Sequence, residues 1–212
     1  MIIGCDISVW DDNPDSPEGI NFKRMRSMGL DFVFIRSSYG SVPDTRYLIN
    51  MPRAVDAGLI TGSYHYLTWK DSIQSQLNTI VNLQKQQPSQ IPIVVDVEER
   101  SGCPAQITAG KLVKQLLDSL RAELGVVPGI YTNVGSWSRM GYINEDILSY
   151  WLWVANWNVK TPSIPKPWQN WVFWQYTISS YGYMFGVQSK SIDLDAFNGS
   201  PDDLKTWIAT VR

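Results

Sequence analysis

The order of strand-like and helix-like segments constrains the fold of this 212-residue chain more than any other feature. Short apolar runs typical of buried strands occur at residues 2–7, 32–36, 60–67, 91–98 and 129–132. Between these runs, apolar residues recur at helical spacing at residues 22–28, 45–57 and 106–124. A further helix is predicted between Asp71, as its N-cap, and Pro88, which would end it. This alternation predicts a parallel sheet with helices packed on its outside.

The last third of the chain has strand-like segments without long helices between them. The segments at residues 151–155, 172–176 and 191–194 are joined by loops rich in Pro, Gly and Trp, and a helix at residues 201–210 ends the sequence. Roughly eight strands, with helices only between the early ones, predict an irregular, TIM-like α/β barrel. No repeat, linker or low-complexity tract divides the chain, so we expect one domain over residues 1–212.

Charge and hydropathy argue against two classes of partner. The net charge of −2 disfavours nucleic acid, which requires a basic surface. No apolar run reaches the roughly 18 residues of a membrane-spanning helix, so we expect no membrane insertion. The first residues carry neither a basic segment nor a secretion cleavage site, which predicts synthesis in the cytoplasm without a signal peptide. The sequence does not indicate an oligomeric state.

The scarcity of cysteine and histidine narrows the possible chemistry. Cys5 and Cys103 are too few for a disulfide framework or a cysteine metal site, and we expect unpaired thiols. The single histidine, His65, argues against a histidine metal site or a Ser-His-Asp triad, and we expect it to be a hydrogen-bonded wall residue. No metal or cofactor is predicted, so catalysis would rest on carboxylates, tyrosines and tryptophans. The ten Trp and ten Tyr residues suit both an aromatic core and stacking on sugar rings.

The sharpest chemical signal is the pair Asp96 and Glu98, which follows an apolar run. Catalytic groups of α/β barrels lie at the carboxyl ends of the strands. Side chains two positions apart on a strand point the same way, about 6.6 Å apart, so both carboxylates would face one site while Val97 faces the opposite side. The structural alternative is a strand-end pair that caps a helix or binds Arg100.

Other polar residues also follow predicted strands: Asp6, Arg36, His65, Tyr131, Asn156, Gln175 and Asp193. Four carboxylates at one barrel mouth would repel each other unless one or more carried a proton. A raised carboxyl pKa is the usual basis of a general acid in glycoside hydrolysis. Asp6 and Asp193 therefore favour a catalytic interpretation of the Asp96–Glu98 pair. The acidic stretch at residues 11–15 is expected to be only a solvated loop.

Seven segments resemble, in order, the strands of one known enzyme family. They are GCDIS at 4–8, GLITGSYHY at 58–66, VDVE at 95–98, GIYT at 129–132, LWVANW at 152–157, WQYT at 174–177 and IDLDAF at 192–197. Each segment alone is a modest signal, but seven in order over nearly the whole chain are specific. On these segments the chain resembles glycoside hydrolase family 25, the Chalaropsis-type lysozymes (muramidases) that are common among bacteriophage endolysins.

The resemblance implies a flattened barrel of five β/α units followed by three strands with few helices. It also implies that the partner is bacterial peptidoglycan, cleaved in the cell wall at the β-1,4 bond from N-acetylmuramic acid to N-acetylglucosamine, with phage lysis as one route of release. By position, Glu98 matches the family's general acid. The supporting acidic positions are matched by Asp6, Asp96 and Asp193, and the groove positions by Tyr64, Tyr131, Trp153 and Gln175. Asp195 lies on the same strand face as Asp193, so the choice between them rests on the resemblance.

Two residues depart from the family pattern. Tyr39 precedes Gly40 where many relatives have a glutamate, and Trp10 stands where many have a glutamine. Both changes place an aromatic ring where a polar group is common. They bear on sugar or peptide preference and leave the acidic pair intact.

The layout of the acids predicts a mechanism. Glu98 would donate a proton to the leaving glycosidic oxygen. Because Asp96 and Glu98 lie at i and i+2 of one strand, they are awkwardly placed to lie on opposite faces of a sugar. We therefore expect the substrate's own 2-acetamido oxygen to attack, oriented by Asp96. The alternatives are a chitinase-like glycosidase, whose longer run of acids is missing here, and a non-catalytic cell-wall carbohydrate-binding barrel.

Overall fold

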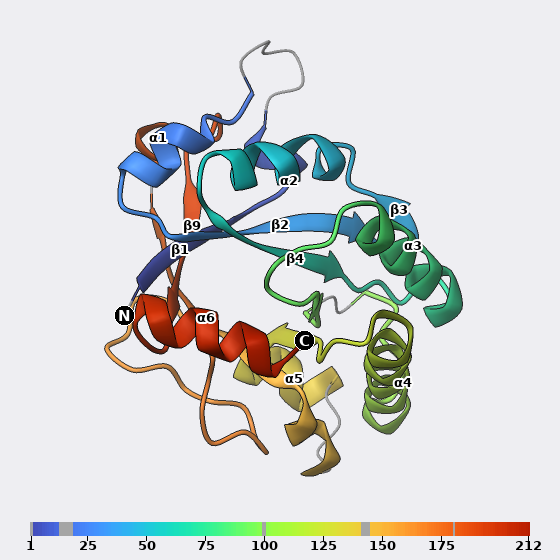
Figure 1. The fold of residues 1–212 in the computed structure, drawn as a ribbon. Coiled ribbons are helices and arrows are strands. Elements are labelled where there is room, and N and C mark those ends of the chain that lie inside the picture. The colour runs from blue at the N-terminus through green and yellow to red at the C-terminus, as the bar shows by residue number, and fades with distance from the viewer. Residues whose placement is uncertain (1, 13–18, 99–100, 141–144, 180) are drawn as a thin grey trace.

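The chain folds into a closed barrel of eight strands (Figure 1). The computed structural model describes residues 2–12, 19–98, 101–140, 145–179 and 181–212. In barrel order the strands are β1 (Ile2–Ile7), β9 (Ile192–Phe197), β8 (Phe173–Ser179), β7 (Trp151–Ala155), β6 (Gly129–Thr132), β5 (Val94–Asp96), β4 (Ile60–Tyr66) and β2 (Phe32–Tyr39). Pairing between β1 and β2 closes the barrel, and a short strand β3 (Val42–Pro43) extends β2 as a hairpin.

Five β/α units precede three strands, as expected. The helices are α1 (Phe22–Ser27), α2 (Tyr47–Asp56), α3 (Ile73–Gln86), α4 (Gln106–Leu124), α5 (Val134–Met140) and α6 (Pro201–Thr210), with short 3-10 helices η1 (Val9–Asp11), η2 (Glu145–Ser149) and η3 (Gly182–Phe185). Figure 1 shows α2, α3 and α4 outside the barrel and α6 beside the N-terminus. Within the described segments, no helix has the length and apolar character of a membrane span.

The last strand runs against its neighbours, which the sequence did not predict. β9 is antiparallel to both β1 and β8, whereas the other barrel pairs are parallel. A parallel return requires a crossover, usually a helix, and the described part of the connection, residues 181–191, contains only the 3-10 helix η3. Asp193 therefore lies at the start of its strand. Because β9 is reversed, that start meets the carboxyl ends of the parallel strands.

Aromatic rings fill the inside of the barrel. Phe34 stacks on Trp153 with ring centroids 4.3 Å apart, and Phe173 meets Phe34 edge-on at 5.0 Å. Gly62 makes room for this packing, because a Cβ there would lie 2.3 Å from Phe34 Cδ1. At the end opposite the strand carboxyl termini, Trp207 of α6 packs on Phe173 at 5.5 Å. The interior is thus filled and closed at one end, which leaves the other end as the place for a pocket.

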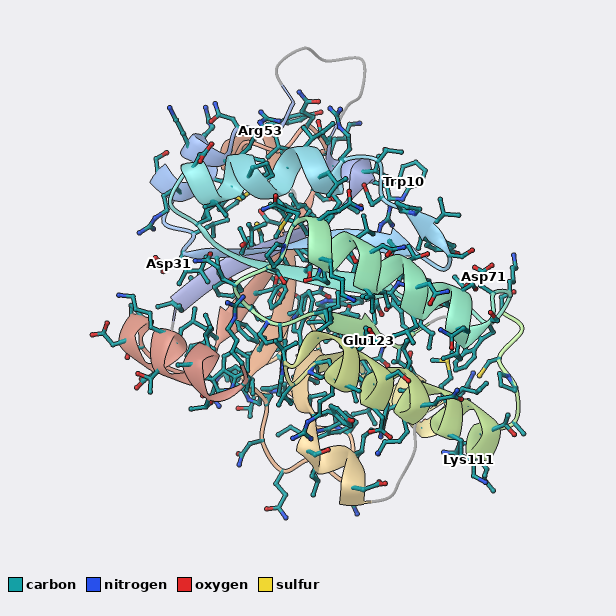
Figure 2. The ribbon with its side chains drawn as sticks, turned by 45° about the vertical axis from the view of Figure 1, so that its right-hand side comes forward. Trp10, Asp31, Arg53, Asp71, Lys111 and Glu123 are labelled. Atoms are coloured by element: carbon teal, nitrogen blue, oxygen red, sulfur yellow. The ribbon has the colours of Figure 1, made fainter. Side chains whose placement is uncertain are left out.

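Several predicted boundaries were wrong. The strands predicted at residues 32–36, 172–176 and 191–194 each run three residues further, to Tyr39, Ser179 and Phe197. The 91–98 run forms a strand only over Val94–Asp96, since Pro92 has no N–H for a ladder and the adjacent apolar residues are buried in irregular backbone. The cap of α3 is Ser72, whose hydroxyl accepts from Ser75 N, instead of Asp71. Asp71 instead accepts from Ser41 N at 3.1 Å and Thr68 Oγ1 at 3.0 Å, and so ties the β2–β3 turn to the loop before α3 (Figure 2).

Candidate active site

All the predicted site residues line one pocket at the open end of the barrel. Its volume is about 200 Å³. The predicted residues that line it are Asp6, Tyr64, Asp96, Glu98, Tyr131, Trp153, Gln175 and Asp193. Barrel closure explains how the two ends of the chain meet there, because Asp6 of β1 lies directly opposite Asp193 of β9 in the strand register.

The local backbone turns Asp96 and Glu98 toward the pocket. Regular strand structure stops at Asp96, but Val97 N still donates to Tyr131 O at 2.9 Å, so the alternation of side chains continues one residue further. Val97 is fully buried in the core between the barrel and its helices, while Glu98 is half-buried at the pocket. Asp96 is only 4% exposed, and its Oδ1 has no hydrogen-bond partner among the described residues.

Burial and mutual repulsion raise the pKa values of the pocket acids. The pKa of Asp6 is raised well above its usual range, first by burial and then by the charge of Asp193. The pKa of Asp96 is raised in the same way, by burial and then by the charge of Glu98. Burial, with a contribution from Asp11, raises the pKa of Asp193 to about 6. This pocket therefore favours carboxyl groups that retain protons at pH values where free aspartate is ionised.

Gln175 fixes the position of Asp6. Its Nε2 donates to Asp6 Oδ2 at 2.7 Å, and its Oε1 accepts from Tyr131 OH at 2.9 Å and from Trp157 Nε1 at 2.8 Å. Both ends of the amide are therefore occupied, which sets the direction of the Asp6 carboxyl. Trp157 lies in the loop after β7 and is 46% exposed. It continues the inward positions 153 and 155 beyond the end of β7, and the predicted site did not include it.

Trp153 does not present an open ring face on which a sugar could stack. It is 1% exposed, and its Nε1 donates to Asp195 Oδ1 at 2.8 Å. It therefore lies in the wall of the pocket with its ring faces used in the core. Trp174 packs in the outer core and is 7% exposed, so among Trp153, Trp157 and Trp174 it is Trp157 that is open to solvent.

Two pocket residues were missing from the predicted site, Arg36 and Tyr66. Arg36 lowers the pKa of Asp96, although burial and Glu98 outweigh it, and its Nε donates to Asp44 Oδ2 at 2.9 Å. Tyr66 stacks on the half-exposed Tyr39 with ring centroids 4.8 Å apart. The same-face rule for positions 64 and 66 of one strand would have found Tyr66. Trp10, the other unusual aromatic, lies in η1 and is 81% exposed (Figure 2).

His65 and the acidic stretch have structural environments. His65 is fully buried outside the pocket lining, with Nδ1 2.8 Å from Ser38 Oγ and Nε2 3.0 Å from Gln76 Oε1, and burial lowers its pKa to about 4. It is hydrogen-bonded, as predicted. The expectation of a solvated acidic loop was wrong for Asp12, which is 1% exposed and pairs with Arg46 at 2.7 Å. Residues 13–15 lie outside the described residues.

The cysteine thiols are unpaired, and the possible metal ligands are not grouped in the described residues. Cys5 and Cys103 are free, and Cys5 is buried. Within the described residues, no three His, Cys, Asp or Glu side chains are grouped to hold a metal ion. What the arrangement offers chemically is a group of proton-holding carboxyls beside hydrogen-bonding tyrosines and an amide.

Comparison with known proteins identifies the family. A sequence model of the Glycosyl hydrolases family 25 matches residues 5–185. The chain is 30% identical to YegX of Escherichia coli O157:H7, over 100% of this chain and 75% of that protein, and 29% identical to Lysozyme M1 of Streptomyces globisporus, over 93% and 68%.

Solved structures share the fold. A bacterial lysozyme from Streptomyces coelicolor superposes with a TM-score of 0.84 at 24% identity, covering 100% of this chain and 98% of that one. A muramidase from Trichobolus zukalii gives 0.81 at 23% identity, covering 100% of each chain. These structures show the shared fold, and the family match over residues 5–185 shows that the chain belongs to the Glycosyl hydrolases family 25 and is a glycoside hydrolase.

Proposed function

We propose that this chain is a lysozyme (N-acetylmuramidase) that hydrolyses the β-1,4 bond between N-acetylmuramic acid and N-acetylglucosamine in bacterial peptidoglycan. The observation that carries the proposal is the pocket that gathers Glu98, Asp96, Asp6 and Asp193 at the barrel mouth. Similarity to Lysozyme M1 and to lysozyme and muramidase structures supports the same substrate.

In this proposal Glu98 is the general acid. Glu98 is half-buried at the pocket, whereas its neighbour Asp96 is only 4% exposed. Repulsion between the two carboxylates favours one proton on the pair, and in the proposal Glu98 carries it when the substrate is bound. Glu98 transfers its proton to the glycosidic oxygen while the bond from that oxygen to the anomeric carbon breaks. The resulting carboxylate then takes a proton from the water that completes hydrolysis.

The attacking group in the proposal is the 2-acetamido oxygen of the substrate. Asp96 and Glu98 are two positions apart on the same wall of the pocket, and an acid–nucleophile pair on opposite faces of the sugar requires a different arrangement. Asp96 Oδ1 is buried and accepts no hydrogen bond from the residues that the structure describes, and an acetamido N–H would supply one. Asp96 thus orients the acetamido group and stabilises the positive charge that develops on it.

Product analysis on matched cell walls tests the proposal. We expect fragments ending in reducing N-acetylmuramic acid, with the first anomer retained, and a large fall in cleavage but not in binding when muramic acid is de-N-acetylated. Mass spectrometry and NMR of the digests measure these outcomes. Reducing N-acetylglucosamine ends or cleavage of chitin would indicate a chitinase-like enzyme, and binding without cleavage would indicate a carbohydrate-binding barrel. Equal rates on both walls, or an inverted anomer, would contradict substrate assistance.

A further inference from the structure

A buried carboxyl group lies directly beneath the pocket, outside the set that lines it. Asp195 is 0% exposed and lies on the inner face of β9, opposite Gly4 of β1 and Gln175 of β8 in the strand register. Its Oδ1 accepts from Trp153 Nε1 at 2.8 Å. Its Oδ2 has no hydrogen-bond partner among the described residues.

The Asp6 carboxyl group is the neighbour that could share a hydrogen bond with Asp195 Oδ2. Gly4 pairs with Asp195 and Asp6 pairs with Asp193, so Asp6 and Asp195 are diagonal neighbours on the inner face of β1 and β9. Two carboxyl groups can share a hydrogen bond only if one of them carries a proton. None of the ion pairs formed by described residues includes Asp195. An ionised carboxylate at this depth without a cation would be strongly destabilising, so the proton is best placed on Asp195.

The charged and titratable surroundings agree with that placement. Burial raises the pKa of Asp195 well above its usual range, with further contributions from Asp6 and Asp193, while the Trp153 hydrogen bond opposes them. Cys5, behind β1, and Tyr176, on β8, are neutral groups that Asp195 also influences. Burial and the charge of Asp193 raise the pKa of Asp6 as well, but the hydrogen bond that Asp6 accepts from Gln175 Nε2 opposes this rise and favours its ionised form.

We propose that Asp195 is a positioning residue that stays protonated, donates a hydrogen bond to Asp6 and, together with Gln175, holds the Asp6 carboxylate toward the pocket. The importance of Asp6 for catalysis rests on the proposed function, but the proton on Asp195 does not. No bond to substrate forms at Asp195, and its proton remains between the two carboxyl groups during turnover.

The protonation of Asp195 can be measured without any substrate. In wild-type protein labelled with ¹³C at the aspartate carboxyl carbons, we expect Asp195 to keep the shift of a protonated acid from about pH 5 to about pH 8, well above the ordinary aspartate pKa of about 3.9. An Asp195 signal that is ionised over this range would overturn the proposal. This result stands even if no peptidoglycan is cleaved, so it separates failure of this proposal from failure of the proposed function.

A pair of variants tests the positioning role. Asp195→Asn keeps an N–H donor for Asp6 and an oxygen for Trp153, so kcat should stay within about 3-fold and the acid limb of the pH–rate profile should not move. Asp195→Ala removes the donor, so kcat should fall about 10- to 100-fold with KM within about 2-fold. The acid limb should also shift to higher pH, because the ionised form of Asp6 loses a hydrogen bond.

The control for these variants is Asp202→Asn, at a side chain that is 92% exposed and far from the pocket lining. It should leave kcat and the pH profile unchanged. Equal losses in Asp195→Asn and Asp195→Ala, or an unmoved acid limb in a folded Asp195→Ala protein, would overturn the positioning role. If Asp195→Ala does not fold, the Asn variant and the wild-type titration still decide.

Discussion

At the scale of single residues, the pocket depends on side chains held in unfavourable ionisation environments. Asp193 is the clearest case, because burial raises its pKa to about 6 while an unfolded chain would leave it near 3.9. The native state therefore binds more protons than the unfolded state between these pH values. The contribution of Asp193 to the stability of the fold is therefore fully present below about pH 4 and is lost as the pH rises through about 6.

Replacing this acid should stabilise the fold at neutral pH. We expect Asp193→Asn to raise the free energy of unfolding by about 1–3 kcal/mol at pH 7, with a difference that shrinks toward pH 4. Denaturant unfolding at several pH values measures this, with Asp202→Asn as a surface control. Equal stability of Asp193→Asn and wild type at pH 7, or a gain that grows in acid, would contradict the prediction.

Sequence reasoning found Asp6, Asp96 and Glu98 because inward positions alternate along strands that end at the same mouth. The choice of Asp193 over Asp195 came from the family resemblance, since Asp193 lies at the start of the reversed strand β9.

Sequence reasoning did not assign Trp157 to the site, although this residue belongs to the 152–157 segment, because the contact with Gln175 is made from the loop after β7. It also misjudged Asp12, whose burial depends on Arg46 and Asn50 of a distant segment. Contacts that depend on one long-range partner leave no local pattern.

At the scale of elements, the long helices and inner strands followed from their apolar spacing, whereas short elements did not. Helix α5 was missed because Val134–Met140 contains Gly and Ser, which have modest helical preference. A signal was present in Asn133, whose Oδ1 accepts from Ser136 N at 2.9 Å in the manner of a cap. The direction of β9 was missed because direction depends on the preceding connection, not on the strand's own residues.

The inner packing of β2 and β4 gives a prediction at this scale. Gly62→Ala should lower the free energy of unfolding by about 1–3 kcal/mol, because its Cβ would meet Phe34, which is already packed on Trp153 and Phe173. Denaturant unfolding measures the loss. Adding Phe34→Leu should recover part of it in a double-mutant cycle. Strictly additive effects of the two substitutions would show that the Cβ and the ring do not compete.

At the scale of the whole molecule, barrel closure turns a distributed sequence pattern into a site. The first and last strands pair, so Asp6 and Asp193 meet although they lie near opposite ends of the chain. Aromatic packing and α6 fill the opposite end, which leaves one open mouth lined by acids, tyrosines and Gln175. A strand order of this kind could be expected from sequence; the electrostatic state of the mouth required the three-dimensional burial of each carboxyl.

The central claim is that this mouth cleaves peptidoglycan with Glu98 as the proton donor, and a single substitution tests it most directly. Glu98→Gln keeps size and hydrogen bonding but cannot donate a proton as an acid, so the rate of cell-wall lysis should fall about 10²- to 10⁴-fold while unfolding and wall binding stay unchanged. The matched control, Glu123→Gln on the outer surface of α4 (Figure 2), should lyse walls at the wild-type rate. Near-normal lysis by the Glu98→Gln protein would contradict the account.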